Sequence, residues 1–351
     1  MPALPQPPTP PAHDPLGVLA TAWPVVAAAH HVRIVPERVA AVGAELAAGR
    51  SAPPAWDGSL HWRDPERPGR TAAWVLVLDA LNFCFWGGAP DPDRRWRVRV
   101  GDRVHDGYWA LAAALTRAAD EGVPLWDPAF LAAIPEAEVR RILRPDEGRP
   151  GTPEIPLFAA RVAHLRELGR GLRRWDDPTQ GADPASALIA AAGGSAARLV
   201  ELIVSTFPSF ADTATYGGQE VRFYKRAQIL VADLVGAFDG QGLGAFADLD
   251  GLTAFADYKV PQVPQVLRRL GVLAYGDDLA ARIDRFDPIP AGSPEEVEIR
   301  AATVWACEML RRETAGGHPL RAFEVDWALW GIGQDLPADT RPYHRTPTVF
   351  Y

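Results

Sequence analysis

Apolar residues recur at intervals of three and four positions through most of this chain of 351 residues. That spacing is typical of helices that bury one face. Helices are therefore expected within ten segments, at 14–34, 36–49, 61–86, 108–122, 135–144, 156–175, 184–207, 221–238, 265–273 and 293–312. The alternating segment 95–107, which contains Gly101-Asp102, is instead expected to form a β-hairpin. The pattern predicts a mainly α protein with a small β element.

Composition limits the compartment and the partners. The first 15 residues are rich in proline and lack an apolar core segment, so a disordered leader is expected rather than a secretory signal. Residues 16–351 are expected to form a single all-helical domain or two tightly packed lobes, because no connection is long enough for a flexible linker. The two cysteines lie in apolar surroundings, and no apolar run approaches the ~18 residues of a membrane span. A cytoplasmic protein with no membrane partner is expected.

Charge and motif content exclude several functions. The chain has 36 basic and 44 acidic residues, and a net charge of −8 disfavours a protein that grips a nucleic-acid backbone. No histidine pair stands at metal-ligand spacing, and neither a G-x-S-x-G motif nor a phosphate-binding loop occurs. We therefore expect no nucleic-acid partner, no metal and no cofactor.

Residues 223–234, FYKRAQILVADL, raise the first functional question. Apolar residues cover most of this helical segment, which predicts burial on more than one side. Lys225 would then point into a semi-enclosed space, where its ammonium group needs a charged partner. The alternative is a lysine whose stem is buried and whose head reaches water.

Two further segments have the composition of a site. Asp257 follows Phe255-Ala256, and Pro261 and Pro264 are expected to delay the next helix until Gln265. Asp257 is thus either a helix cap or a carboxylate that stabilises a cation in an aromatic-lined site. The segment 78–86 interleaves polar and aromatic side chains, which suits a planar heteroaromatic ligand or, alternatively, an aromatic core. Its candidates are Asp79, Asn82, Phe83 and Trp86.

Taken together, the segments FPSFADTATYGGQEVRFYKRAQILVADL, FADYKVPQV, GSPEEVEIRAATVWACE, DGYWALAAALTRAADEG and YHRTPTVFY resemble the queuosine salvage protein family. The likeness runs from about His31 to Tyr351. It implies a helical fold similar to helix-hairpin-helix DNA glycosylases and hydrolysis of queuosine 5′-monophosphate to queuine and ribose 5-phosphate. Asp257 matches the family's catalytic aspartate and Lys225 its partnering lysine. One departure is the repeat of Val-Pro-Gln at 260–262 and 263–265.

That reaction suggests roles for the other candidates. Asp79 and Asn82 would read the edge of the guanine-like base, and Phe83, Trp86 or Phe210 would stack on it. Further substrate contacts are expected from Tyr224, Gln228, His344 and Arg345, of which the last two would supply positive charge for the phosphate. The alternatives are a non-catalytic queuine or nucleotide carrier and a DNA-repair glycosylase. The net charge and an expected lack of any Lys/Arg-rich hairpin disfavour the repair enzyme. The sequence does not indicate an oligomeric state.

Overall fold

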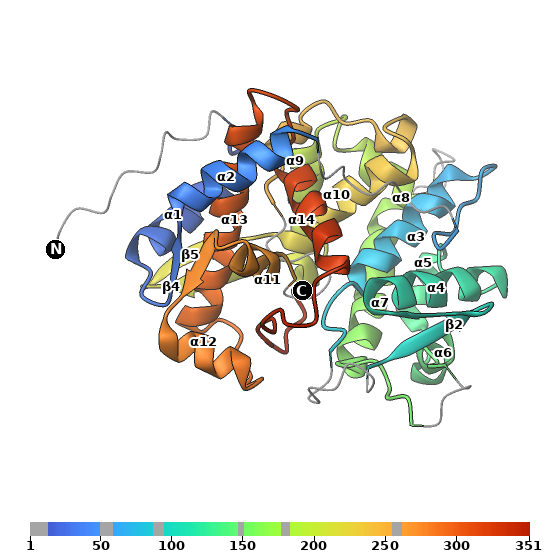
Figure 1. The fold of residues 1–351 in the computed structure, drawn as a ribbon. Helices are drawn as coiled ribbons and strands as arrows, with labels where there is room; N and C mark the ends of the chain where they lie inside the picture. Colours follow the sequence, from blue (N-terminus) through green and yellow to red (C-terminus); the bar gives the residue numbers. More distant parts are fainter. Residues whose placement is uncertain (1–12, 50–58, 87–94, 147–150, 177–182, 255–261) are drawn as a thin grey trace. The chain divides into compact units, whose positions relative to one another are not determined.

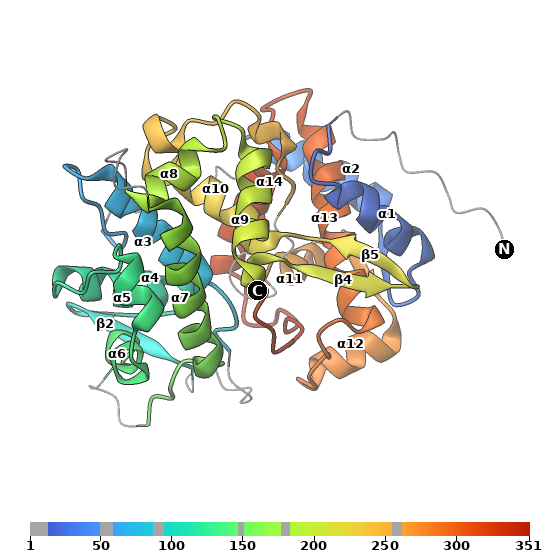
Figure 2. The ribbon, with the colours of Figure 1, turned by 180° about the vertical axis from the view of Figure 1, so that it is seen from behind.

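Helices dominate the protein, and the mainly α prediction is confirmed (Figures 1 and 2). The computed structural model describes residues 13–49, 59–86, 95–146, 151–176, 183–254 and 262–351. The chain divides into two compact units. The first unit contains residues 1–54, 212–228 and 248–348, and the second contains 55–211, 229–247 and 349–351. The expected similarity to helix-hairpin-helix DNA glycosylases stays a prediction.

The first unit is built around one long helix, α13, against which α1 and α2 pack. Helix α13 is capped by Ser293, whose hydroxyl accepts the backbone N–H of Glu296 at 3.4 Å. The described elements of this unit are α1 (Val18–Ala28), β1 (Val32–Ile34), α2 (Pro36–Ala47), β4 (Thr213–Tyr216), β5 (Gln219–Arg222), α11 (Gln262–Arg269), β6 (Leu273–Tyr275), α12 (Asp277–Asp284), α13 (Pro294–Thr314) and α14 (Ala322–Gln334).

The segment 14–34, expected to be helical throughout, ends instead in a strand. Helix α1 stops at Ala28, and β1 pairs antiparallel with β6. The reason is a buried carboxylate: Glu298 of α13 accepts the backbone N–H groups of residues 30–32 at 3.1, 2.6 and 3.1 Å. These groups are therefore unavailable for a helical ladder, and the β-branched Val32 and Ile34 favour the extended chain.

The second unit places α7 against α5 and α3. The approach of α7 to α5 requires Gly169, because a Cβ atom there would lie 2.2 Å from the backbone nitrogen of Ala132. The elements that lie wholly in this unit include α3 (Pro68–Ala80), β2 (Arg97–Val100), β3 (Arg103–Asp106), α4 (Gly107–Asp120), α5 (Pro128–Ala133), α6 (Glu136–Ile142), α7 (Phe158–Leu172), α8 (Pro184–Ala190) and α9 (Ala196–Thr206). Helix α10 (Lys225–Ala237) is divided between the units: its residues up to Gln228 belong to the first unit, and those from Ile229 onward belong to the second.

The hairpin predicted from the sequence is present, but one helix begins earlier than predicted. The hairpin at 95–107 is confirmed as β2–β3, and Gly217-Gly218 forms the turn between β4 and β5 with φ of 55° and 81°. Helix α11 begins at Gln262 rather than Gln265, because Pro264 falls in the first turn, where its missing N–H has no helical partner to lose.

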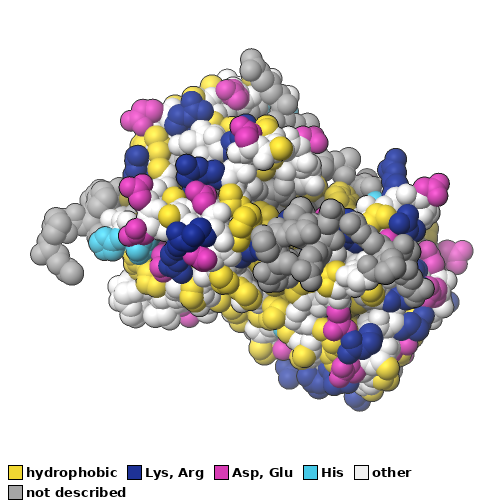
Figure 3. Space-filling view, turned by 60° about the horizontal axis from the view of Figure 1, so that its bottom comes forward, with side chains coloured by type: hydrophobic (Ala, Val, Ile, Leu, Met, Phe, Trp, Pro, Cys, Tyr) yellow, Lys and Arg dark blue, Asp and Glu magenta, His cyan; other side chains and the backbone are white. Residues whose placement is uncertain are grey.

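The expectation that the chain lacks an arginine-rich hairpin is wrong, since Arg97, Arg99 and Arg103 lie on β2–β3. Nearby carboxylates offset part of this charge, because Arg99 pairs with Asp146 at 3.0 Å. Basic and acidic side chains are also interspersed on the face shown in Figure 3. Within the described ranges, no helix has both the length and the apolar character to cross a membrane.

Candidate active site

Lys225 is the first residue of α10 and is only 1% exposed. The interpretation of a lysine with its head in water is therefore wrong. The N-terminal end of a helix carries partial positive charge, so a cation there is disfavoured by the helix as well as by burial. An ammonium group in this position requires negative charge close by.

Asp212, just before β4, supplies a carboxylate at the start of α10. Its Oδ2 accepts the backbone N–H of Lys225 at 3.2 Å, and its carbonyl oxygen accepts those of Phe223 and Tyr224, each at 3.0 Å. The Asp212 side chain is 1% exposed. One buried aspartate thus accepts three consecutive N–H groups at the helix start, where N–H groups have no intrahelical partner.

Tyr224 has a left-handed backbone with φ of 48°. For a bulky residue this conformation costs about 1–3 kcal/mol, and such residues concentrate at functional sites. Because its N–H is held by Asp212 and its carbonyl accepts the N–H of Gln228 at 3.0 Å, the surrounding bonds maintain the strained turn.

Arg300 of α13 lies behind this turn and is as buried as Asp212. Its Nη2 donates to Asp212 Oδ2 at 2.6 Å, and its guanidinium carbon lies 3.9 Å from the centroid of the Phe223 ring. Glu296 lies 3.6 Å from Nη1 of the same guanidinium. A buried cation therefore pairs with the carboxylate and also stacks on the residue two before Lys225.

The fully buried amide of Gln228 joins α10 to the segment before residue 255. Its Nε2 donates to the carbonyl of Phe223 at 2.8 Å and to Thr253 Oγ1 at 3.0 Å, while its Oε1 accepts the N–H of Thr253 at 2.8 Å. Asp257 lies outside the described residues. Past that gap, Gln262 donates to the carbonyl of Gly333, and Gln265 donates to that of Arg341 at 2.8 Å.

His344 and Arg345 are buried in the first unit and differ in charge. Burial and the neighbouring Arg300 lower the pKa of His344 to about 3, so it is neutral at physiological pH and supplies no positive charge. The Arg345 guanidinium carbon lies 4.6 Å from the ring centroid of Phe286. Of these two predicted phosphate contacts, only Arg345 has the charge expected of it.

The candidates from 78–86 lie in the second unit, at the end of α3 and just beyond it. Asn82 Nδ2 donates to Asp79 Oδ1 at 3.3 Å, while Asn82 Oδ1 is buried and accepts no hydrogen bond from any residue that the structure describes. Phe83 is fully buried, and the Trp86 ring lies 6.4 Å from that of Tyr351. Phe210, also buried in this unit, packs 6.0 Å from Phe207.

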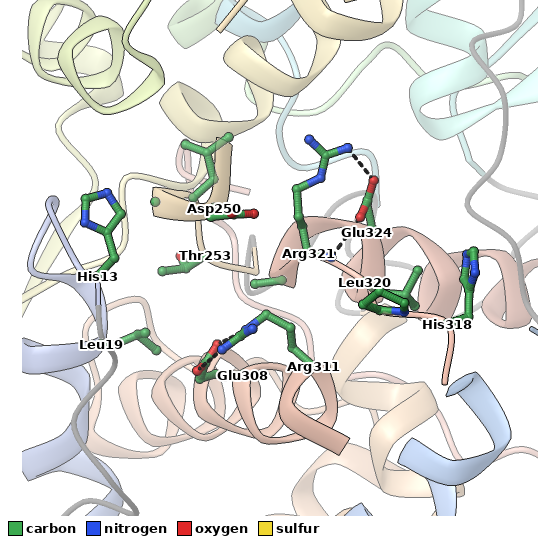
Figure 4. A pocket seen from close by; sticks show the side chains of 14 residues that line it. His13, Leu19, Asp250, Thr253, Glu308, Arg311, His318, Leu320, Arg321 and Glu324 are labelled. Carbon is green, nitrogen blue, oxygen red and sulfur yellow. Dashed lines mark hydrogen bonds and ion pairs between the residues drawn. The ribbon is translucent and has the colours of Figure 1, made fainter. Parts of the chain in front are cut away.

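A cavity of about 770 Å³ lies in the first unit, and Figure 4 shows side chains that line it. Its described lining includes ion pairs between Arg311 and Glu308 at 2.7 Å and between Arg321 and Glu324 at 2.7 Å. Burial opposes ionisation of both glutamates, but the arginines outweigh it and lower both pKa values. None of the predicted site residues is among that lining, so we do not assign the chemistry to this cavity. Over the described residues, no three histidine, cysteine or carboxylate side chains gather closely enough to hold a metal ion.

Comparison with known proteins decides the family. The sequence profile of the family described as "Queuosine salvage protein" matches residues 60–351. The chain belongs to the queuosine salvage protein family. Three relatives carry the name queuosine 5′-phosphate N-glycosylase/hydrolase. The protein from Sphaerobacter thermophilus is 53% identical over 96% of this chain and 98% of its own length. That from Mus musculus is 36% identical over 84% and 86%, and that from Schizosaccharomyces pombe is 34% identical over 76% of each.

Sequence reasoning missed Asp212 and Arg300, although a signal for the arginine was present. Arg300 stands among Ile299, Ala301 and Ala302 in an apolar helical segment, as Lys225 does in its own segment. A charged residue in such a setting is expected to be paired when buried. Its partner Asp212 could not be identified, because the two residues are 88 positions apart.

Proposed function

We propose that this chain is an N-glycosidase that hydrolyses queuosine 5′-monophosphate to queuine and ribose 5-phosphate. The observation that carries the proposal is the match over nearly full length, at 53% identity, to a relative named for this activity. The buried lysine at the start of α10 supports it, because a reaction that develops charge benefits from fixed charges shielded from water.

The reaction breaks the bond between ribose C1′ and base N9 as water adds to C1′. Positive charge grows on the sugar and negative charge on the base. In our proposal the carboxylate of Asp257 stabilises the sugar cation and either activates water or attacks C1′ itself. Lys225 would keep that carboxylate ionised, bind the 5′-phosphate, or do both, and the carboxylate would in turn offset the cost of burying the ammonium group.

The leaving base cannot be protonated on a nitrogen at position 7, because queuine is a 7-deazaguanine with carbon there. Its negative charge is therefore stabilised through its other edges. We propose that Asp79 and Asn82 bind the guanine-like edge, with Phe83, Trp86 or Phe210 as the stacking face. The support is the buried, unused acceptor Asn82 Oδ1, which could accept an N–H of the base.

We further propose that the 5′-monophosphate is preferred over the nucleoside by more than about tenfold, since a charge-assisted phosphate contact contributes about 1.5–3 kcal/mol. Arg345 and Lys225 are the candidates, whereas neutral His344 could contribute only an uncharged contact. Intact tRNA and duplex DNA are not expected to be substrates, given the net charge of −8. The two buried thiols suit a reducing, cytoplasmic setting.

The test is chromatographic detection of queuine after incubation with queuosine, queuosine 5′-monophosphate and queuosine-containing tRNA. We expect repeated turnover of the monophosphate, slower release from the nucleoside and none from tRNA. Binding of the monophosphate without release of base would make the protein a carrier. Release from tRNA would reverse the proposed substrate class.

A further inference from the structure

We infer that Asp212 and Arg300 are a positioning pair, which fixes the backbone at the start of α10 so that Lys225 is held in its working orientation. The inference rests on the proposed function, in which Lys225 takes part in hydrolysis. It adds residues that act through Lys225 rather than on the substrate.

The first step is that a distant aspartate, Asp212, bonds the start of α10. Its flanking residue, Tyr224, has no side-chain carboxylate, amide or aliphatic hydroxyl of the kind that caps helices. Asp212 lies 13 positions before Lys225 in the sequence and takes over this task with its carboxylate and its carbonyl. The three N–H groups it accepts belong to Lys225 and the two residues before it.

The second step is that the turn is strained. Tyr224, at φ of 48°, would relax to an ordinary conformation if its neighbours allowed it. Such a relaxation would rotate the backbone of the next residue, which is Lys225. Holding Tyr224 in place therefore also fixes the direction in which the Lys225 side chain leaves the helix.

The third step is the need for charge on Asp212. A neutral amide could accept the Lys225 N–H equally well, and Asp212 Oδ1 accepts no hydrogen bond. What the carboxylate adds is its charge, which pairs with Arg300 at 2.6 Å and opposes the positive end of α10. Because Arg300 also stacks on Phe223, the pair holds this turn through both its backbone and a side chain.

The test compares Asp212→Asn and Arg300→Lys with a matched control, Glu298→Gln. Glu298 is a buried carboxylate on the same helix as Arg300, and it accepts the backbone N–H groups of residues 30–32 and the hydroxyl of Tyr216, none of which belongs to residues 223–225. We expect kcat for queuosine 5′-monophosphate to fall about ten- to hundredfold in both test variants, with KM within about twofold. Glu298→Gln should lower the melting temperature and leave kcat unchanged.

Hydrogen exchange of the backbone amides of residues 223–225 separates this inference from the proposed function. These amides should exchange faster in Asp212→Asn and Arg300→Lys and normally in Glu298→Gln, whatever the substrate is. An active wild type with unchanged kcat in both test variants would overturn the positioning role alone. Unchanged exchange would also overturn it, and so would failure of both variants to fold, since the pair would then serve stability. A wild type that never releases queuine would refute the proposed function, and the exchange data would still decide whether the pair holds the turn.

Discussion

The guanidinium carbon of Arg161 lies 4.3 Å from the centroid of the Phe83 ring, and both side chains are fully buried. The same guanidinium donates to the carbonyl groups of Leu81, Phe83 and Cys84, and its Nε donates to that of Pro156. A buried arginine thus holds the backbone of a candidate binding segment in the second unit, as Arg300 does indirectly at the start of α10. Each of the two backbone segments contains a residue with positive φ, namely Cys84 at 39° and Tyr224 at 48°.

Replacing Arg161 by methionine should therefore destabilise the second unit strongly. Each buried carbonyl left without a donor costs about 1–3 kcal/mol, so a total loss of at least about 3 kcal/mol in the free energy of unfolding is expected. Arg166→Met, on the same helix, is the control, because Arg166 donates to the carbonyl of Ile134 and should cost about 1 kcal/mol. Equal denaturation midpoints for the two variants would show that the hydrogen bonds of Arg161 do not stabilise this backbone segment.

Asn82→Ala tests the proposed reading of the base. Since Asn82 Oδ1 accepts no hydrogen bond from a described residue, its loss should raise KM or lower kcat for queuosine 5′-monophosphate, while loss of the bond from Nδ2 to Asp79 should cost only about 1 kcal/mol of stability. Thr303→Val is a control that removes a buried hydroxyl bonded within the protein, to the carbonyl of Ile299 at 2.7 Å. It should lower stability but not activity. A fully active or an unfolded Asn82→Ala protein would place this residue in the core instead.

The sequence predicted those elements whose cause lies within a few residues. The hairpin at 95–107 and the burial of α10 follow from local conformational preference and from periodicity. The strand β1 did not follow, because its partner β6 lies about 240 positions away and its N–H groups are taken by Glu298. The same limit hid Asp212, whose role depends on where the hairpin β4–β5 returns the chain to α10.

At the candidate site, the sequence identified the kinds of residues but not their states of charge. Lys225 was singled out as a cation in an apolar helix, and its burial is observed. His344 was expected to be positive, whereas its interior position beside Arg300 keeps it neutral. The contact of Gln228 with the substrate stays a prediction, and its amide bonds Thr253 and Phe223 within the chain. Whether a histidine is charged, or an amide available, depends on neighbours that only the folded chain brings together.

His344 should make the protein less stable in acid. Burial and then Arg300 lower its pKa from 6.5 to about 3 in the folded chain. Above pH 6.5 it is neutral in both states; as the pH falls from there toward 3, only the unfolded chain gains the proton. This residue should therefore remove on the order of 1.4 kcal/mol of stability per pH unit across that window. Denaturation at several pH values should show a smaller slope in His344→Gln than in the wild-type protein. Parallel curves for wild type and His344→Gln would contradict this.

Both cysteines should resist thiol reagents while the protein is folded. Cys84 and Cys307 are buried thiols, and burial, aided by Asp326 and Glu308, raises the pKa of the Cys307 thiol well above its usual value. Because the thiolate is the reactive form, labelling by a chromogenic disulfide should be slow in buffer and rapid in denaturant. Fast labelling of one cysteine in buffer, identified by mass spectrometry, would show that its surroundings open readily.

The last prediction concerns Asp257 and Lys225 together. Asp257→Asn keeps the size and the capping ability of the side chain but removes the negative charge beside the developing sugar cation. Loss of such a stabiliser typically costs about 3–4 kcal/mol, or roughly a hundred- to a thousandfold in rate. Substrate should still bind to this variant, because the proposed base contacts are untouched. Lys225→Ala should also be slow, with weaker binding if the lysine contacts the phosphate.

If the two residues act as one unit, the double variant should lose less than the sum of the two single losses. Single-turnover hydrolysis by the four proteins, with melting temperatures measured alongside, checks this. Arg222→Ala is the control, because it removes a partly exposed cation that lies three positions before Lys225 and pairs with Glu220. Near-normal turnover by a stable Asp257→Asn protein would leave this carboxylate with no more than a capping role. Full additivity would mean that Lys225 acts on the phosphate, independently of the carboxylate.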